Sequence, residues 1–515
     1  MKVKHHEDQM SQKYITVGVA KNRISSPGSY HWGPWSMILG ALSFFIVLIS
    51  VSQLLGEPEL HEKWPLYVSV LSITWLATYL ICSNAQFRTP YLITSAYIIP
   101  LCAFHLGLII PYAFGWSEVS GLTSGTFAAW MERAGWYTVL ALGCIGLGFS
   151  ISLKRSNFKI SKHIVEESGS NKALDILFSD GIGLLIASMI FLVMAIYSFG
   201  NLLNYSRVDF FRLNAGDTRG LGVFTMVLPI AVIFLAIGAR KRVHKIIAYV
   251  LAALSFAVLL LSGSRSGALF PLLVGVVLWV KVGRRIPKPV AISALMFVLI
   301  AIPAIGLLRS SGESYNKIQQ EDVIKSTENA KIGDGFSEMG STGTVLANII
   351  RLVPNHDPFR YGSSYLHALA DSIPNIGLNQ NYSDRLRASQ KTMTDPKAAL
   401  DLIPSDWLTY RLDKARFDAG EGLGFSGIGE PYINFGLIGV IGFFGFLGYF
   451  LGRLDSFNLL ASPKMLVFTS IILWPLLPLV RNDFGNFTKP VVFTLIILLI
   501  WRTALKLFNG GRIYK

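Results

Sequence analysis

Long runs of apolar residues, separated by short polar connections, make up most of the chain. A membrane-spanning helix needs roughly 20 mostly apolar residues in a row, because lipid offers no partner for unpaired backbone groups. The candidate spans are 34–55, 64–83, 91–114, 133–153, 180–200, 221–239, 246–262, 266–282, 289–308, 433–452, 465–481 and 489–507. The pattern therefore predicts an all-α polytopic membrane protein with about 12 transmembrane helices.

One polar interval, residues 309–431, is far longer than the other connections, and connections of this length are usually functional or disordered. It contains helix-like stretches at 365–372 and 398–417, so we expect a partly helical cap between the ninth and tenth spans. A re-entrant segment is an alternative within 246–282 and at 465–481. The predicted divisions are a tail at 1–33, nine spans within 34–308, the loop at 309–431, three spans within 432–507 and a tail at 508–515.

Basic residues are concentrated in particular connections. Residues 239–245 and 281–288 each hold four Lys or Arg and no acid, whereas residues 56–63 hold three glutamates. Cytoplasmic loops are enriched in Lys and Arg, so this pattern predicts cytoplasmic termini and a periplasmic large loop. A net charge of +15 would suggest nucleic acid in a soluble protein, but here the cytoplasmic loops explain it, and we expect no nucleic-acid partner.

The composition and the absent motifs narrow the chemistry. Only 15% of the residues are charged, against about 25% in an ordinary soluble domain. Cys82, Cys102 and Cys144 lie in apolar segments, which indicates neither a disulfide framework nor a zinc site. The sequence has no Walker A motif, Rossmann fingerprint, HExxH or CxxC, so we expect no metal and no cofactor. The middles of the spans are nearly free of charge, which favours chemistry at the outer surface over transport.

Two candidate clusters contain arginine at the predicted outer boundary. Arg265 lies in the short connection 261–267, where its guanidinium either binds phosphate oxygens or extends to lipid headgroups. Arg481 and Asp483 lie in the connection 481–486. In one interpretation the two residues cap a helix and their charges pair with each other. In the other, Arg481 contacts an anionic ligand and Asp483 orients Arg481.

A third cluster, Glu430, Tyr432 and Asn434, lies at the entrance to the tenth span. Glu430 either stabilises the helix N-terminus through the helix dipole or acts as a partly desolvated general base. In the large loop, His367 and Asp371 are four residues apart and share one face if that stretch is helical. Such a pair is either surface decoration or part of a site.

The predicted outer loops are also rich in arginine, although outward-facing loops are usually poor in basic residues. This enrichment points to an anionic ligand on that side, because the guanidinium fork suits phosphate and carboxylate oxygens. The arginines concerned are Arg207, Arg212, Arg219, Arg309, Arg351, Arg360 and Arg411.

Four segments resemble bacterial O-antigen polymerases, the Wzy-type oligosaccharide-repeat-unit polymerases. They are LSGSRSGA at 261–268, YGSSYLHALADSIPNI at 361–376, GIGEPYINFGLIGV at 427–440 and RNDF at 481–484. The resemblance implies a metal-independent glycosyltransferase of the inner membrane that joins undecaprenyl-diphosphate-linked oligosaccharides at the outer face. It also implies membrane lipid and a chain-length regulator protein as partners.

Such a reaction needs positive charge for the departing diphosphate and a base for the attacking hydroxyl. Arg265 and Arg481 are the candidates for the first role, supported by Arg207, Arg212, Arg309 and Arg360. Glu430, Asp483 and His367 are the candidates for the second, with Tyr432 and Asn434 as further substrate contacts. An O-antigen ligase, which shares this layout and relies on a loop histidine, and a flippase of lipid-linked sugars remain as alternatives.

Overall fold

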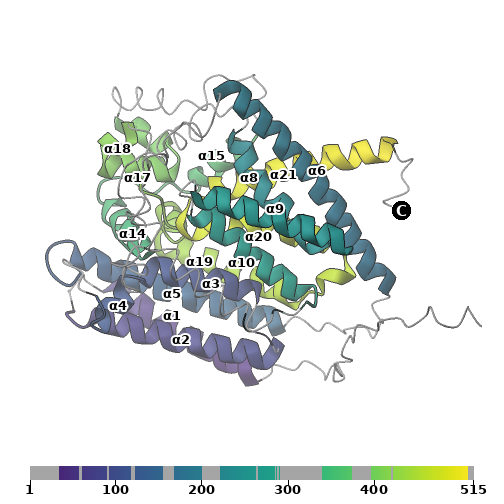
Figure 1. Ribbon diagram of the computed structural model, residues 1–515. Coiled ribbons are helices and arrows are strands. Elements are labelled where there is room, and N and C mark those ends of the chain that lie inside the picture. The colour runs from purple at the N-terminus through teal and green to yellow at the C-terminus, as the bar shows by residue number, and fades with distance from the viewer. Residues whose placement is uncertain are drawn as a thin grey trace, which may run out of the picture.

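A computed structural model of the chain describes residues 34–56, 61–87, 89, 92–117, 122–154, 167–199, 221–261, 265–284, 286, 289, 339–373, 396–418 and 422–508. Every regular element in these ranges is a helix, which confirms the all-α prediction (Figure 1). Seven of the described helical segments are long and apolar enough to cross a membrane. The protein is therefore a membrane protein, and the count of 12 spans remains a prediction.

Most predicted spans coincide with single helices. The long helices are α1 (Pro34–Leu55), α2 (Trp64–Phe87), α5 (Ala128–Lys154), α6 (Glu167–Phe199), α8 (Leu221–Gly238), α9 (Arg242–Leu261), α10 (Arg265–Lys281), α19 (Gly429–Ser456), α20 (Pro463–Leu476) and α21 (Gly485–Phe508). The predicted span 91–114 is instead two helices, α3 (Ile93–Leu106) and α4 (Ile109–Ala113). The predicted ninth span falls almost entirely outside the described residues.

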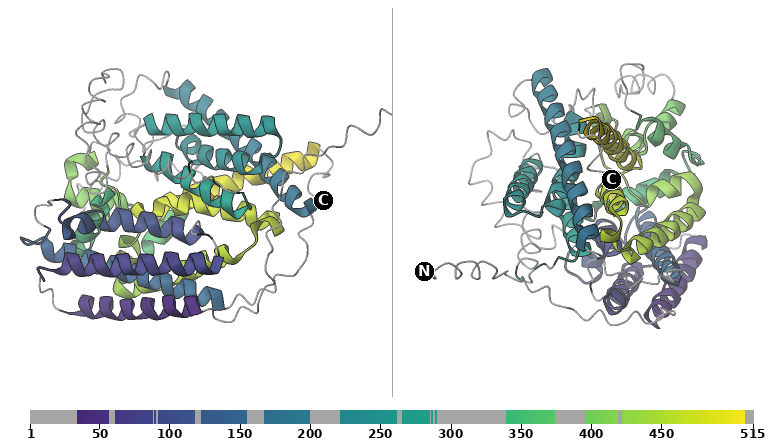
Figure 2. Two further views of the ribbon diagram at one scale, coloured as in Figure 1. Left: turned by 60° about the horizontal axis from the view of Figure 1, so that its bottom comes forward. Right: turned by 90° about the vertical axis from the view of Figure 1, so that its right-hand side faces the viewer.

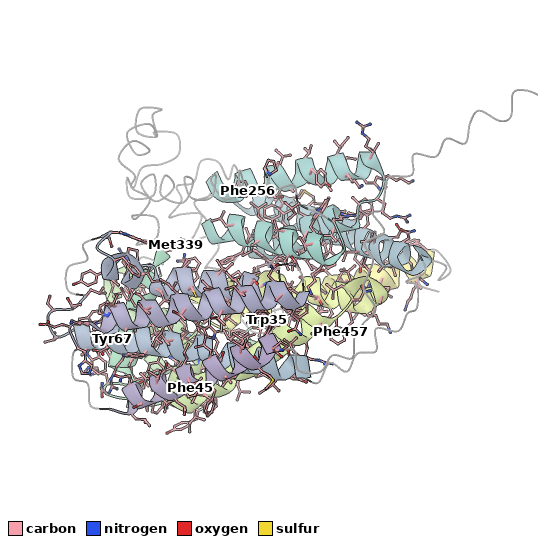
Figure 3. All side chains as sticks on the ribbon, turned by 90° about the horizontal axis from the view of Figure 1, so that it is seen from below. Trp35, Phe45, Tyr67, Phe256, Met339 and Phe457 are labelled. Atoms are coloured by element: carbon pink, nitrogen blue, oxygen red, sulfur yellow. The ribbon has the colours of Figure 1, made fainter. Side chains whose placement is uncertain are left out.

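The helix surfaces are arranged as lipid requires. Helix α1 buries Ser36, Ser43 and Ser50 and exposes large apolar residues, among them Phe45 at the outer edge of the bundle (Figure 3). One buried serine is used for packing, since the Trp75 indole donates a hydrogen bond of 2.9 Å to the Ser43 hydroxyl. Small and polar residues therefore lie between the helices, while apolar residues face outward, as in other membrane bundles.

Helices α5 and α19 pack closely because glycines remove the side chains between them. A methyl group at Gly448 would overlap the carbonyl oxygen of Ile145, and one at Gly148 would overlap that of Gly445. Gly448 and Gly452 form a GxxxG pair on α19, a spacing that lets two helix backbones approach. The contact fixes the position of α19.

Gly448→Ala tests this contact. We expect a loss of about 1–3 kcal/mol of folding stability, because overpacking a close contact costs that much. The matched control is Gly442→Ala on the same helix, where nothing lies within 4 Å of the added carbon. Thermal unfolding of the purified protein in detergent should show a lower midpoint for Gly448→Ala only, and equal midpoints would contradict the packing.

The bundle has two distinct ends, and the long helices run roughly between them (Figure 2). At one end the Asp455 carboxylate accepts the backbone N–H groups of Ile93 and Thr94, at 2.8 and 3.0 Å, and lies 3.3 Å from the Lys281 ammonium. Arg284 donates to the Ala239 carbonyl at this same end. The two predicted cytoplasmic connections, 239–245 and 281–288, thus share one end of the bundle.

The other end holds the described part of the large loop (Figure 1, upper left). Its helices are α14 (Ser341–Leu352), α15 (Ser363–Ala370), the 3-10 helix η3 (Pro396–Asp401), α17 (Pro404–Leu412) and α18 (Lys414–Asp418), which we call the cap. Asp357 ties the cap together, accepting hydrogen bonds from the Trp407 indole at 2.9 Å and from Arg411 at 2.8 and 2.6 Å. Helix α14 packs directly on the break between α3 and α4, where Gly340 leaves no room for a side chain.

Candidate functional site

A break in α19 lies directly beneath the cap. Phe435 (φ −139°, ψ 16°) and Gly436 (φ +60°, ψ −142°) are not helical, so the first turns of α19 form a separate unit. A continuous helix would pair the carbonyls of Ile433 and Asn434 with N–H groups four residues on. Here they accept the N–H groups of Arg360 (2.8 Å) and Tyr361 (3.1 Å) from the cap. The break therefore joins the cap to the bundle.

Asn434 reinforces this junction. Its side-chain oxygen accepts the Gly362 N–H at 2.8 Å, and its amide donates to the Ser364 hydroxyl at 2.8 Å and to the Glu430 carbonyl at 2.9 Å. The side chain is fully buried, and its donors and acceptor are all used within the protein. These hydrogen bonds give Asn434 a positioning role between the cap and α19, and its substrate contact stays a prediction.

Glu430 is only 2% exposed and sits in the first turn of α19. One carboxylate oxygen accepts the Ser364 O–H at 2.9 Å, and the other accepts the Phe484 N–H at 2.6 Å. The carboxylate therefore links three segments, α19, the cap helix α15 and the connection before α21. No cation hydrogen-bonds to it within the described part of the chain, so neutral donors hold it.

Asp483 lies in the same buried region, since it directly precedes the residue whose N–H binds Glu430. Its carboxylate accepts the Asn486 side-chain amide at 2.8 Å and the Ser405 N–H at 3.3 Å. It also accepts the Asn486 N–H at 3.4 Å, which places it as a cap on α21. The contacts of Asp483 with Asn486 are thus those of a residue that caps a helix.

Arg360 brings a positive charge close enough to interact with both carboxylates. It is 8% exposed, donates to the Leu402 carbonyl at 2.9 Å and lies 5.2 Å above the Trp407 ring. Burial lowers the pKa of Arg360 to about 10, and Glu430 is the first of the carboxylates that oppose the shift. The guanidinium is therefore still cationic at neutral pH. Its Nη2 has no hydrogen-bond partner among the described residues.

Arg481 lies beside this cluster, at the end of η5 (Pro478–Arg481). Its guanidinium lies 5.1 Å from the centre of the Phe104 ring, and the Phe104 and Phe270 rings are 6.1 Å apart. Phe270 is in the second turn of α10, the helix that begins at Arg265. The backbone of Arg265 therefore lies at the same end of the bundle as Arg481. The Arg265 side chain is outside what the structure describes.

The cap helix α15 brings His367 to the buried region around Glu430 and Asp483, and Asp371 follows directly after the helix. His367 has a buried Nδ1 without a hydrogen-bond partner among the described residues. Four residues on, burial raises the pKa of Asp371, although Lys489 and His367 act in the opposite direction. Lys489, in the second turn of α21, was not singled out from the sequence. His367, in α15, and Asp371, at its C-terminal cap, thus lie on the side of α15 that faces the buried region.

Tyr432 serves as packing in the structure. Its hydroxyl donates to the Val353 carbonyl at 2.9 Å, and its ring packs edge-on against Tyr137 and Phe359. Tyr432 therefore connects α19 with α5 and the cap, and its substrate contact stays a prediction. Arg207, Arg212 and Arg309 lie outside the described residues.

Comparison with known protein families identifies the family of this chain. The model of the O-antigen polysaccharide polymerase Wzy family matches residues 35–510, nearly the whole chain. The chain belongs to this family. No curated protein and no solved structure matches it. Membership in the Wzy family confirms the resemblance seen in the four short segments and makes polymerisation of O-antigen repeat units its family function.

Ser364 is the site residue that sequence reasoning missed. It is 1% exposed, donates to Glu430 and accepts from Asn434, so it completes the junction of this Wzy-family chain. Ser364 and Glu430 are 66 residues apart in the sequence, so no local pattern indicates their contact. The one available signal was its place inside the segment 361–376, which resembles the family.

Gly436→Ala tests the break in α19. A side chain at φ +60° and ψ −142° is strained by about 1–3 kcal/mol, so we expect the cap junction to loosen and polymerisation to fall. Gly445→Ala, in regular helix with nothing within 4 Å of the new carbon, is the control. Polymer length on gels and the thermal midpoint should both drop for Gly436→Ala alone. Wild-type behaviour in both measurements would rule out a required break.

Proposed function

We propose that this protein polymerises undecaprenyl-diphosphate-linked oligosaccharide repeat units into O-antigen or a related surface polysaccharide at the periplasmic face of the inner membrane. The single observation that carries the reaction is the family match over residues 35–510. The buried cluster beneath the cap supports the location of the site. A chain-length regulator protein is a proposed partner, and no metal takes part in the proposed mechanism.

The proposed reaction transfers the growing chain from its lipid diphosphate to the next repeat unit. The acceptor hydroxyl oxygen attacks the anomeric carbon of the growing chain, and the bond from that carbon to the diphosphate oxygen breaks. The diphosphate leaves with the bonding electrons, and the hydroxyl proton passes to a base. The protein must therefore supply cationic donors on one side of the reacting carbon and a carboxylate or imidazole on the other.

Arg265 and Arg481 are proposed to bind the departing diphosphate, with Arg360 as a third cation. Support comes from their shared end of the bundle and from the Arg360 donor that has no partner among the described residues. Arg207, Arg212 and Arg309 keep their predicted supporting role. Phosphate oxygens suit guanidinium groups because two parallel N–H donors match their geometry.

Glu430 is proposed as the base. It is buried near Arg360 and accepts hydrogen bonds from two neutral donors, so a substrate hydroxyl that displaces the Ser364 contact would meet a carboxylate oxygen. Asp483 is a less suitable base because the Asn486 and Ser405 donors employ its carboxylate to cap α21. His367 is the alternative, and it favours the ligase interpretation, which relies on a loop histidine.

A deletion strain distinguishes the reaction classes. Loss of a polymerase should leave lipopolysaccharide with the core plus one repeat unit on a gel, whereas loss of a ligase or of a flippase should leave bare core. We therefore expect the core-plus-one band and its extension to a ladder when the gene is restored. Bare core would overturn the proposed polymerase activity.

Glu430→Gln tests the base. Loss of a positioned general base typically lowers a rate by about 100-fold or more, so we expect repeat-unit addition to fall by at least that factor. The control is Glu132→Gln, which changes another buried carboxylate outside the proposed site. Rates are measured with purified, folded protein in liposomes containing a lipid-linked repeat unit. A Glu430→Gln rate within a few-fold of wild type would remove Glu430 from this role.

The double variant Arg265→Ala/Arg481→Ala tests the diphosphate site. Each charged hydrogen bond lost is worth about 1.5–3 kcal/mol, so we expect the rate to fall at least 100-fold. Lys414→Ala/Arg416→Ala removes two exposed cations of the cap and serves as the control. The same reconstituted assay applies. Long polymer made at the normal rate by the Arg265/Arg481 variant would show that the diphosphate binds elsewhere.

A further inference from the structure

Helix α15 has its polar side turned toward the protein and its apolar side turned outward. Ser364, Ala368 and Ser372 are at most 3% exposed, and His367 and Asp371 flank them on the same side. The opposite side carries Leu366, Leu369 and Ile373, which are 68%, 51% and 71% exposed. Leu366 and Leu369 are three residues apart and share one face of α15, and the exposed Ile373 follows in the turn after the helix. We call these three residues the outer stripe. A helix that faces water shows the reverse arrangement.

The outer stripe of α15, Leu366, Leu369 and Ile373, follows closely on the segment that meets the break in α19, where the Tyr361 N–H binds the Asn434 carbonyl. Tyr361 and Ile438 are 76% and 79% exposed, and Phe435 is 49% exposed. Gly362, one residue before α15, lies directly against the Phe435 ring. Lower on α19, Phe446 is also exposed, on the same face as Ile438. The apolar surface thus runs from α15 onto the outward face of a candidate membrane span.

We propose that the outer stripe of α15 lies in the hydrocarbon at the membrane surface, in contact with lipid acyl chains. The continuity of the stripe with the exposed face of α19 identifies lipid as the occupant, since that face of a spanning helix borders the bilayer. Amphipathic helices that lie in the membrane surface bury their apolar side below the headgroups in this way. The inference concerns lipid contact and holds whether or not Glu430 is the base.

The polar side of α15 faces the buried cluster around Glu430. Through Ser364 the helix contacts the Glu430 carboxylate, and Ser372, in the turn that follows the helix, donates to the Thr488 hydroxyl of α21 at 2.6 Å. One helix, about 10 Å across, therefore separates lipid on its outer side from the buried polar cluster on its inner side. A lipid-linked headgroup at this level reaches the cluster without leaving the membrane surface.

Site-directed spin labels measure this placement. Single cysteines replace Leu366 or Leu369 in the full chain, with Cys82, Cys102 and Cys144 changed to alanine, and each is labelled and reconstituted in liposomes. Collisions with oxygen, which concentrates in hydrocarbon, are compared with collisions with a water-soluble nickel complex. Leu499→Cys, 69% exposed on α21, is the lipid reference, and Ala415→Cys, exposed on α18, is the water reference.

The ratio of oxygen to nickel collisions decides the proposal. We expect ratios at 366 and 369 that approach the ratio at 499 and exceed that at 415 several-fold. A ratio equal to that at 415 would overturn the proposal by placing the stripe in water. Protection from both reagents would also overturn it, because a second copy of the chain, another protein or other residues of this chain would then cover the stripe. Polymerisation by the same labelled proteins is measured separately, so failure of the lipid contact is distinguishable from failure of the proposed function.

Discussion

The organisation of the site depends on the carbonyl groups that the break in α19 releases. Unpaired carbonyls next to lipid are costly, so the protein must supply replacement donors. It supplies them from Arg360 and Tyr361, and this pairing brings the start of α15 to the first turn of α19. Only then can Ser364 reach Glu430. Because Gly436 permits the break, one glycine governs the meeting of cap, bundle and carboxylate.

The buried carboxylates are held in two ways, since Asp357 forms an ion pair with Arg411 whereas others rely chiefly on neutral donors. Asp455 is held mainly by backbone N–H groups and a threonine hydroxyl, with Lys281 beside it, whereas Glu430 and Asp483 are held by neutral donors alone among their described hydrogen bonds. Neutral donors offset the cost of burying a charge without consuming a cation. Near the cap this arrangement leaves the Arg360 guanidinium with a donor that the described residues do not use. A cation retained in this way suits a site that must receive an anionic ligand.

The sequence predicted the helices far better than the contacts. The predicted span 34–55 coincides with α1, because a lipid-facing helix can be recognised from a long, continuous run of apolar residues. The clustering of Glu430, Asp483 and Arg360 was anticipated only as a shared end of the bundle. The roles of Asn434 and Tyr432 were not foreseen, and neither was Ser364, since they depend on hydrogen bonds between segments about 70 residues apart. Local patterns carry no information about such partners.

The two parts of α19, below and above the break at Phe435 and Gly436, are held in different ways. Below the break, Gly448 and Gly452 let the helix pack closely against α5. Above the break, the first turn is held by the cap through hydrogen bonds, which can exchange with those of a substrate at small net cost. Packing therefore fixes the helix below the break, while hydrogen bonds to the cap position the first turn and the Glu430 carboxylate. A polymerase that must release and rebind a growing chain needs both, a rigid support and contacts that can be replaced.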